Sequence, residues 1–211
     1  SSGHTSIAFY KNKIQFGLRK IKHQKVKKGQ HPDNISYVIW DLVLQNSHSD
    51  VSIVPEGKKE SKINYFRGNA EKEIVSEEFE KITYKNVYPQ IDLVFYLDSR
   101  KTLKYDFVVN PGGNYEDIQL SYQGIKKLKL DSKGNLQITT PWGNKLKEGR
   151  PISWQIIGGK KVPVNINYKV NGNNLTYESK SRLSAGATLV IDPMMLDWST
   201  YFYGKVGTAG W

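Results

Sequence analysis

The sequence of 211 residues contains no cysteine, which excludes a disulfide framework, a thiolate zinc site and a cysteine nucleophile. It also has no apolar run near the roughly 18 residues that a membrane-spanning helix requires. No signal peptide is recognisable at the N-terminus, and a mature secreted chain would look the same. Hydrophobic residues make up 38% and charged residues 24% of the chain, proportions typical of a globular protein with a sizeable core.

Acidic residues are missing from residues 1–32, which hold eight Lys or Arg and so supply +8 of the net charge of +11. The rest of the chain is nearly balanced, so the charge does not indicate a nucleic-acid-binding fold. Lysines clustered around a single arginine favour non-specific contact with a polyanion over base reading. The candidate contact residues for a polyanion or a protein partner are Arg19, Lys20, Lys22, Lys25, Lys27 and Lys28.

Alternation of apolar and polar residues predicts a mainly β fold. Residues 13–19 alternate, and residues 35–44 are apolar on both faces, so we expect a long hairpin whose tip carries the densest positive charge. Residues 91–97 and 103–109 predict a second hairpin. Turn signals every 8–12 residues are typical of an antiparallel sandwich or barrel-like sheets.

One segment favours a helix instead. Val75, Phe79 and Ile82 follow a helical spacing among several glutamates, so the sequence allows at most one short helix, at about residues 70–82.

The motifs of common chemistries are missing. The chain has no nucleophile elbow, zinc-protease, EF-hand or phosphate-binding signature, and its four histidines all fall within the first 48 residues. We therefore expect no catalytic residue, no metal and no cofactor. Asp92 and Asp106 each interrupt an apolar strand and are the best candidates for paired carboxylates of a glycosidase, although buried partners of Lys or backbone groups are the simpler interpretation.

Aromatic residues make up 12% of the chain and admit three interpretations. They could pack in the core between strands, stack on sugars, or stack on the bases of single-stranded nucleic acid. The core interpretation is favoured, because the tyrosines that fall within strand-like runs are Tyr84, Tyr96, Tyr105, Tyr122, Tyr168 and Tyr177.

Several fragments occur in an order typical of one family. They are residues 63–68 (INYFRG), 84–96 (YKNVYPQIDLVFY), 103–112 (LKYDFVVNPG), 118–124 (IQLSYQG), 134–136 (GNL), 148–155 (EGRPISWQ), 189–193 (LVIDP) and 198–204 (WSTYFYG). With these, the chain resembles the N-terminal domain of secreted bacterial proteins that carry SBBP-type β-propeller repeats, commonest in Bacteroidota. Gln90 and Tyr203 stand where that family usually has glycine, and the lysine-rich stretch has no counterpart in the resemblance.

The resemblance implies a β-rich domain over residues 1–194, with two sub-sheets at about 1–110 and 111–194, and the start of a propeller module at 195–211. It implies a non-catalytic domain of a large secreted or outer-membrane surface protein, often a cargo of type IX secretion. The expected role is display, docking or adhesion, and the expected partners are other proteins of the cell envelope or secretion machinery. A carbohydrate-binding module that uses exposed aromatics is the alternative, and an enzyme fragment is a third; no specific nucleic acid and no membrane span are expected.

Overall fold

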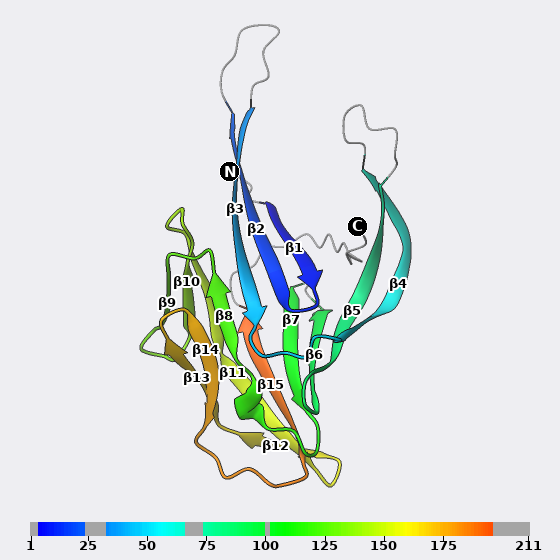
Figure 1. The fold of residues 1–211 in the computed structure, drawn as a ribbon, viewed down its shortest axis with the longest axis vertical. Coiled ribbons are helices and arrows are strands. Elements are labelled where there is room, and N and C mark those ends of the chain that lie inside the picture. The colour runs from blue at the N-terminus through cyan, green and yellow to red at the C-terminus, as the bar shows by residue number, and fades with distance from the viewer. Residues whose placement is uncertain (1–3, 24–32, 66–73, 100–101, 196–211) are drawn as a thin grey trace, which may run out of the picture.

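The protein folds into two antiparallel sheets that pack face to face (Figure 1). The computed structural model describes residues 4–23, 33–65, 74–99 and 102–195. The mainly β sandwich predicted from the sequence is confirmed, and the sheets do not close into a barrel. Within these residues the only helical element is a 3₁₀ turn, η1 (Tyr115–Asp117), and no helix is long and apolar enough to cross a membrane.

The first sheet has six strands in the order β1-β2-β3-β8-β14-β13. The strands are β1 (His4–Tyr10), β2 (Lys13–His23), β3 (Asp33–Leu44), β8 (Leu120–Gln123), β13 (Ile166–Asn171) and β14 (Asn174–Ser179).

The second sheet has nine strands in the order β4-β5-β6-β7-β15-β11-β10-β9, with β12 also paired to β11. The last strand that the structure describes, β15, therefore lies in the interior of the sheet, between β7 and β11. The strands are β4 (Ser52–Tyr65), β5 (Ile74–Tyr88), β6 (Ile91–Leu97), β7 (Leu103–Val109), β9 (Lys127–Leu130), β10 (Leu136–Thr139), β11 (Lys145–Ile157), β12 (Lys160–Val164) and β15 (Thr188–Met195).

Each sheet takes strands from both halves of the chain. The expected division into sub-sheets at about 1–110 and 111–194 is therefore wrong. The reason is that β3 pairs with β8 and β7 pairs with β15, so contacts remote in sequence assemble both sheets.

The core lies between the sheets and is rich in aromatic rings. Along β7, Leu103, Tyr105 and Phe107 point inward while the intervening residues are partly exposed, as alternation requires. Centroids of neighbouring rings are 5.0 to 6.5 Å apart, the spacing of edge-to-face and tilted aromatic pairs. The rings of this chain of contacts are Phe9, Tyr84, Phe95, Tyr105, Phe107, Tyr177 and Tyr168.

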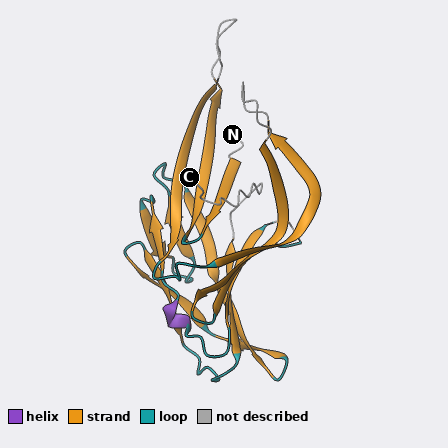
Figure 2. Cartoon of the chain, turned by 45° about the vertical axis from the view of Figure 1, so that its right-hand side comes forward, coloured by secondary structure: helices purple, strands orange, loops and turns teal. Residues whose placement is uncertain are grey.

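Two long hairpins extend past the body of the sandwich at one end, β2–β3 from the first sheet and β4–β5 from the second (Figures 1 and 2). The predicted hairpin between residues 13 and 44 is confirmed, and its ladder runs from Lys13 opposite Val43 to His23 opposite Asp33. The predicted strands 91–97 and 103–109 also form, with those bounds.

The helix expected at about 70–82 is wrong for the part of it that the structure describes. From Ile74 onward these residues belong to β5, which pairs with β4 on one side and β6 on the other. Pairing on both sides buries Ile82 and Thr83. This tertiary environment outweighs the weak helical spacing of the segment.

Candidate functional site

The β2–β3 hairpin projects because its sheet neighbours end early. On one side β8 reaches only Gln123, which lies opposite Asp41, and on the other side β1 ends with His4 opposite Arg19. Beyond these pairs the ladder between β2 and β3 continues to His23 and Asp33. We call the outer surface of this hairpin, formed by Gln15, Arg19, Tyr37, Ile39 and Asp41, the hairpin face.

The hairpin face has a polar base. Asp41 accepts hydrogen bonds from Lys13 Nζ and from Gln15 Nε2, each at 2.8 Å. The Lys13 ammonium also lies 5.2 Å from the centre of the Tyr10 ring, within the range of a cation–π contact. These contacts hold the lower part of the hairpin in place.

Above that base the hairpin face is apolar and exposed. Tyr37 is 61% and Ile39 is 55% exposed, the two highest values among the exposed large hydrophobic residues that the structure describes. Ile39 lies opposite Gly17, which has no side chain to cover it, and Tyr37 lies opposite Arg19. The Arg19 Nε is buried without a hydrogen-bond partner within the described part of the chain.

The six basic candidate residues are only partly visible in the structure. Arg19 lies on the hairpin face, and Lys20 and Lys22 occupy β2 opposite Ser36 and Asn34. Lys25, Lys27 and Lys28 lie outside the described residues, so the cationic tip itself remains a prediction.

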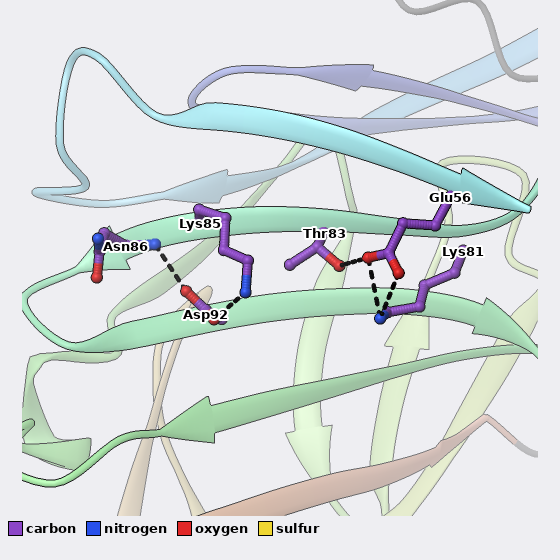
Figure 3. A network of polar contacts seen from close by, with 6 residues as sticks. All are labelled: Glu56, Lys81, Thr83, Lys85, Asn86 and Asp92. Carbon is purple, nitrogen blue, oxygen red and sulfur yellow. Dashed lines mark hydrogen bonds and ion pairs between the residues drawn. The ribbon is translucent and has the colours of Figure 1, made fainter.

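A second feature is a row of ion pairs on the outer face of β4, β5 and β6 (Figure 3). Glu56 binds Lys81 at 3.0 Å and accepts a hydrogen bond from the Thr83 hydroxyl at 3.2 Å. Lys81 lowers the pKa of the exposed Glu56 carboxyl. Because both partners of this pair are well exposed to solvent, the pair adds little to stability.

Asp92 fixes the turn between β5 and β6. Its carboxylate accepts hydrogen bonds from the Lys85 ammonium and from the backbone N–H of Asn86, each at 2.8 Å (Figure 3). Asn86 and Gln90 have φ values of 49° and 57°, in the left-handed region. Position 90, where the similar family usually has glycine, therefore has a left-handed backbone although the residue here is glutamine.

The candidate pair Asp92 and Asp106 is divided between two separate clusters. Asp92 binds Lys85 and the backbone N–H of Asn86. Asp106 instead lies near Asp192 of β15 and accepts a hydrogen bond from the Tyr96 hydroxyl at 3.2 Å. Asp192 in turn binds the Lys104 ammonium at 3.0 Å. Burial, reinforced by the charge of Asp192, raises the pKa of Asp106 to about 7.

The core holds one further acid, which sequence reasoning missed. Glu148 of β11 is 2% exposed, and its carboxyl group lies within hydrogen-bond distance of the hydroxyl groups of Tyr105 and Tyr168. Burial raises its pKa to about 7. Its position in the fragment 148–155 is the only signal in the sequence that could have singled it out.

The profile of one protein family, described as "Domain of unknown function (DUF7948)", matches residues 1–194. The chain belongs to this family. No curated protein and no solved structure shows significant similarity to the DUF7948 chain. The family description carries no activity, ligand or partner, so the choice between the sites of this domain depends on their geometry.

The tyrosines of the DUF7948 domain lie mainly in the core, so they cannot stack on a sugar or a base. Of the six strand tyrosines named above, five are buried and Tyr96 is partly buried. The exposed aromatics of the described residues are Tyr10, Tyr37 and Trp142. Tyr10 and Tyr37 share the outer face of the first sheet but lie at opposite ends of the β2 ladder, and Trp142 belongs to a turn of the second sheet.

Among the described residues of the DUF7948 domain, no group of three or more His, Asp or Glu side chains could hold a metal ion. The Asp106–Asp192 cluster is already bound by Tyr96 and Lys104. The hairpin face differs from both acidic clusters, because it presents the large apolar side chains of Tyr37 and Ile39 to solvent, beside the partly exposed Arg19. It is therefore the candidate functional site.

Proposed function

We propose that this chain is a non-catalytic docking domain of a large secreted or cell-surface bacterial protein, and that it binds another protein through the hairpin face. The observation that carries the proposal is the exposure of Tyr37 and Ile39 beside Arg19, on a hairpin that projects beyond its sheet. The secreted, multidomain context rests on the resemblance to propeller-repeat proteins given above.

The composition of the hairpin face supports protein binding. Tyrosine and arginine are enriched where binding energy concentrates, since both combine a large apolar surface with directed hydrogen bonds. Full burial of a large apolar side chain contributes roughly 1.5–3 kcal/mol, and slightly over half of Ile39 and of Tyr37 is still exposed, so burying the rest would contribute about 1 kcal/mol for each. Arg19, which lies opposite Tyr37 and is partly exposed, adds a positive charge beside these two side chains.

Charge favours an acidic partner. β2 belongs to the segment 1–32, which carries no Asp or Glu, and of the two acids of β3, Asp33 and Asp41, the second is paired with Lys13. Positive charge near an apolar contact accelerates association with an acidic surface and rejects basic ones. We therefore expect the partner, in the cell envelope or secretion machinery, to present an acidic surface with an apolar centre.

The test is site-specific photo-crosslinking of the domain to the native envelope. A photo-reactive residue at position 37 should give a discrete adduct that weakens as salt rises, and Ile39→Ala should reduce that adduct at least tenfold. The same probe at position 152 is the matched control, because Ile152 is 51% exposed but lies in the second sheet. Equal adducts from both positions, or none from position 37, would overturn the proposal.

A further inference from the structure

Glu148 is buried at a position where an ionised carboxylate would lose most of its hydration, at a large cost in free energy. It is 2% exposed, and it precedes the point in β11 where the register with β15 shifts, between Gly149 and Ile152. Before the shift Glu148 faces the core, and after it the odd-numbered Ser153 and Gln155 do so. The shift therefore sets the side chain of Glu148 between the two sheets.

Two tyrosine hydroxyls contact a single oxygen of this carboxyl group. Tyr105 Oη, from β7 of the same sheet, lies 2.8 Å from Glu148 Oε1. Tyr168 Oη, from β13 of the opposite sheet, lies 2.5 Å from the same oxygen. Glu148 thus joins the two sheets through a polar contact inside an otherwise aromatic core.

The second contact of Tyr168 decides where the protons lie. Its hydroxyl oxygen is also 3.1 Å from the backbone carbonyl oxygen of Gly149. A hydroxyl has one proton, so it cannot donate fully both to an ionised carboxylate and to that carbonyl. If Glu148 carries a proton, it donates to Tyr168, Tyr168 donates to Gly149, and Tyr105 donates to Glu148, so each of the three protons has an acceptor.

The Lys104 ammonium favours the ionised form of Glu148, but it makes no direct contact with that carboxyl group and is already bound to Asp192. β7 contributes Tyr105 and, without direct contact, Lys104; β13, β14 and β8 contribute the hydroxyls of Tyr168, Tyr177 and Tyr122. β10 places Leu136 opposite it. Burial raises the pKa of each of these four tyrosines well above its ordinary value, so they remain neutral donors.

We propose that Glu148 is a neutral carboxylic acid in the folded domain and that its proton completes a hydrogen-bonded bridge from β7 through β11 to β13, which makes the packing of the two sheets acid-dependent. The raised pKa of Glu148, about 7, agrees with this geometry. The folded state holds this proton at pH values where the unfolded chain has lost it. The bridge therefore stabilises the domain fully below the ordinary glutamate pKa, and its contribution is lost as the pH rises toward 7.

The experiment measures unfolding by urea between pH 4.5 and 7.5 in an Asp106→Asn background, since Asp106 titrates in the same range. The equilibrium constant for unfolding should rise on the order of 100-fold across this range. Glu148→Gln keeps the shape, stays uncharged and can still donate to Tyr168, so this variant should fold and lose that rise. The infrared band of a protonated carboxylic acid at pH 5 should also disappear in Glu148→Gln.

Tyr168→Phe provides the second variant, because it removes the bridge to the opposite sheet and leaves Glu148 in place. It should fold less stably than its parent at pH 5 and show a smaller difference at pH 7.5. A Glu148→Gln protein with the parental pH dependence, or a parent with no carboxylic acid band at pH 5, would overturn the proposal.

Discussion

At the scale of the residue, single polar groups decide the backbone path of this domain. The turn between β5 and β6 depends on one carboxylate, Asp92, and on two residues with left-handed backbone, Asn86 and Gln90. Gln90 also accepts a hydrogen bond at its carbonyl from Asn110 N–H, at 2.8 Å, so the turn is tied to the end of β7. Substitutions here test how each group contributes.

Gln90→Gly should stabilise the domain by about 0.5–1 kcal/mol. The φ of Gln90 is 57°, a conformation that costs a residue with a Cβ atom about 1–2 kcal/mol. Glycine removes this strain, but it loses more conformational entropy on folding, which offsets part of the stabilisation. Urea denaturation measures the change. Gln90→Ala is the control, because alanine keeps the Cβ and should give no gain; an equal gain from alanine would contradict the role of backbone strain.

Asp92→Ala should destabilise the domain by about 2 kcal/mol, because the backbone N–H of Asn86 loses its hydrogen bond to a charged carboxylate. Lys85→Ala should cost less than about 1 kcal/mol, since the lysine side chain is 52% exposed and contributes only a screened ion pair. The two midpoints of urea unfolding give the comparison. Equal losses would assign the effect to the ion pair instead of the turn.

At the scale of the element, close backbone contact sets the base of the β2–β3 hairpin. Gly124 follows β8 with a φ of 78°, and a Cβ atom at this position would lie 2.9 Å from the carbonyl oxygen of Ile39. The chain at position 124 therefore lies so close to β3 that a residue with a Cβ atom would not fit there without a shift of the backbone. The exposed part of the hairpin begins at this contact.

Gly124→Ala should cost about 2–4 kcal/mol, which combines backbone strain with displacement of β3. Gly134→Ala is the matched control: its φ is 79°, but nothing lies within 4 Å of the added Cβ, so it should cost only about 1 kcal/mol. Denaturant unfolding of both variants gives the difference. Losses of the same size would show that the contact with β3 carries no energy of its own.

Strand positions were predictable where local pattern and turn residues agree. Residues 91–97 and 103–109 are apolar runs with turn residues between them, and both form the expected strands. The start of β5 was mispredicted because its glutamates and spaced apolar residues also fit a helix. The pairing of β3 with β8 was not predictable, since it depends on residues about 80 positions apart.

The hairpin face and the Glu148 cluster were likewise predictable only as far as local pattern determines them. The exposed face of the hairpin follows from alternation, but the loss of sheet neighbours above Asp41 that leaves Tyr37 and Ile39 open does not. Glu148 gave no local signal, because its burial depends on tyrosines from β7 and β13. Long-range packing, not local pattern, creates both features.

At the scale of the whole molecule, the acid–base balance favours a mildly acidic optimum of stability. Glu148 and Asp106 both have a pKa raised to about 7, chiefly by burial. The folded state binds their protons more tightly than the unfolded chain, so stability falls as the pH rises from about 4 to 7. Asp131, whose pKa is lowered by hydrogen bonds from Asn135, acts in the opposite direction at lower pH.

We therefore expect the midpoint of thermal unfolding to be higher near pH 5 than near pH 7.5. Asp106→Asn should raise the midpoint at pH 7.5 and change it little at pH 5, because it removes a carboxyl whose ionised form is unfavourable in the fold. Calorimetry at the two pH values measures both effects. A midpoint that rises with pH would contradict this balance.

The position of β15 has a consequence for folding. Because Thr188–Met195 separates β7 from β11, strands β4 to β7 cannot join the rest of the nine-stranded sheet until β15 has formed. Pairing over such sequence distances is slow, in the range of milliseconds to seconds for β proteins. Until β15 is inserted, the edges of β7 and β11 that it will cover are free to pair with strands of other chains. We therefore expect this domain to be most prone to aggregation during folding, before β15 is in place.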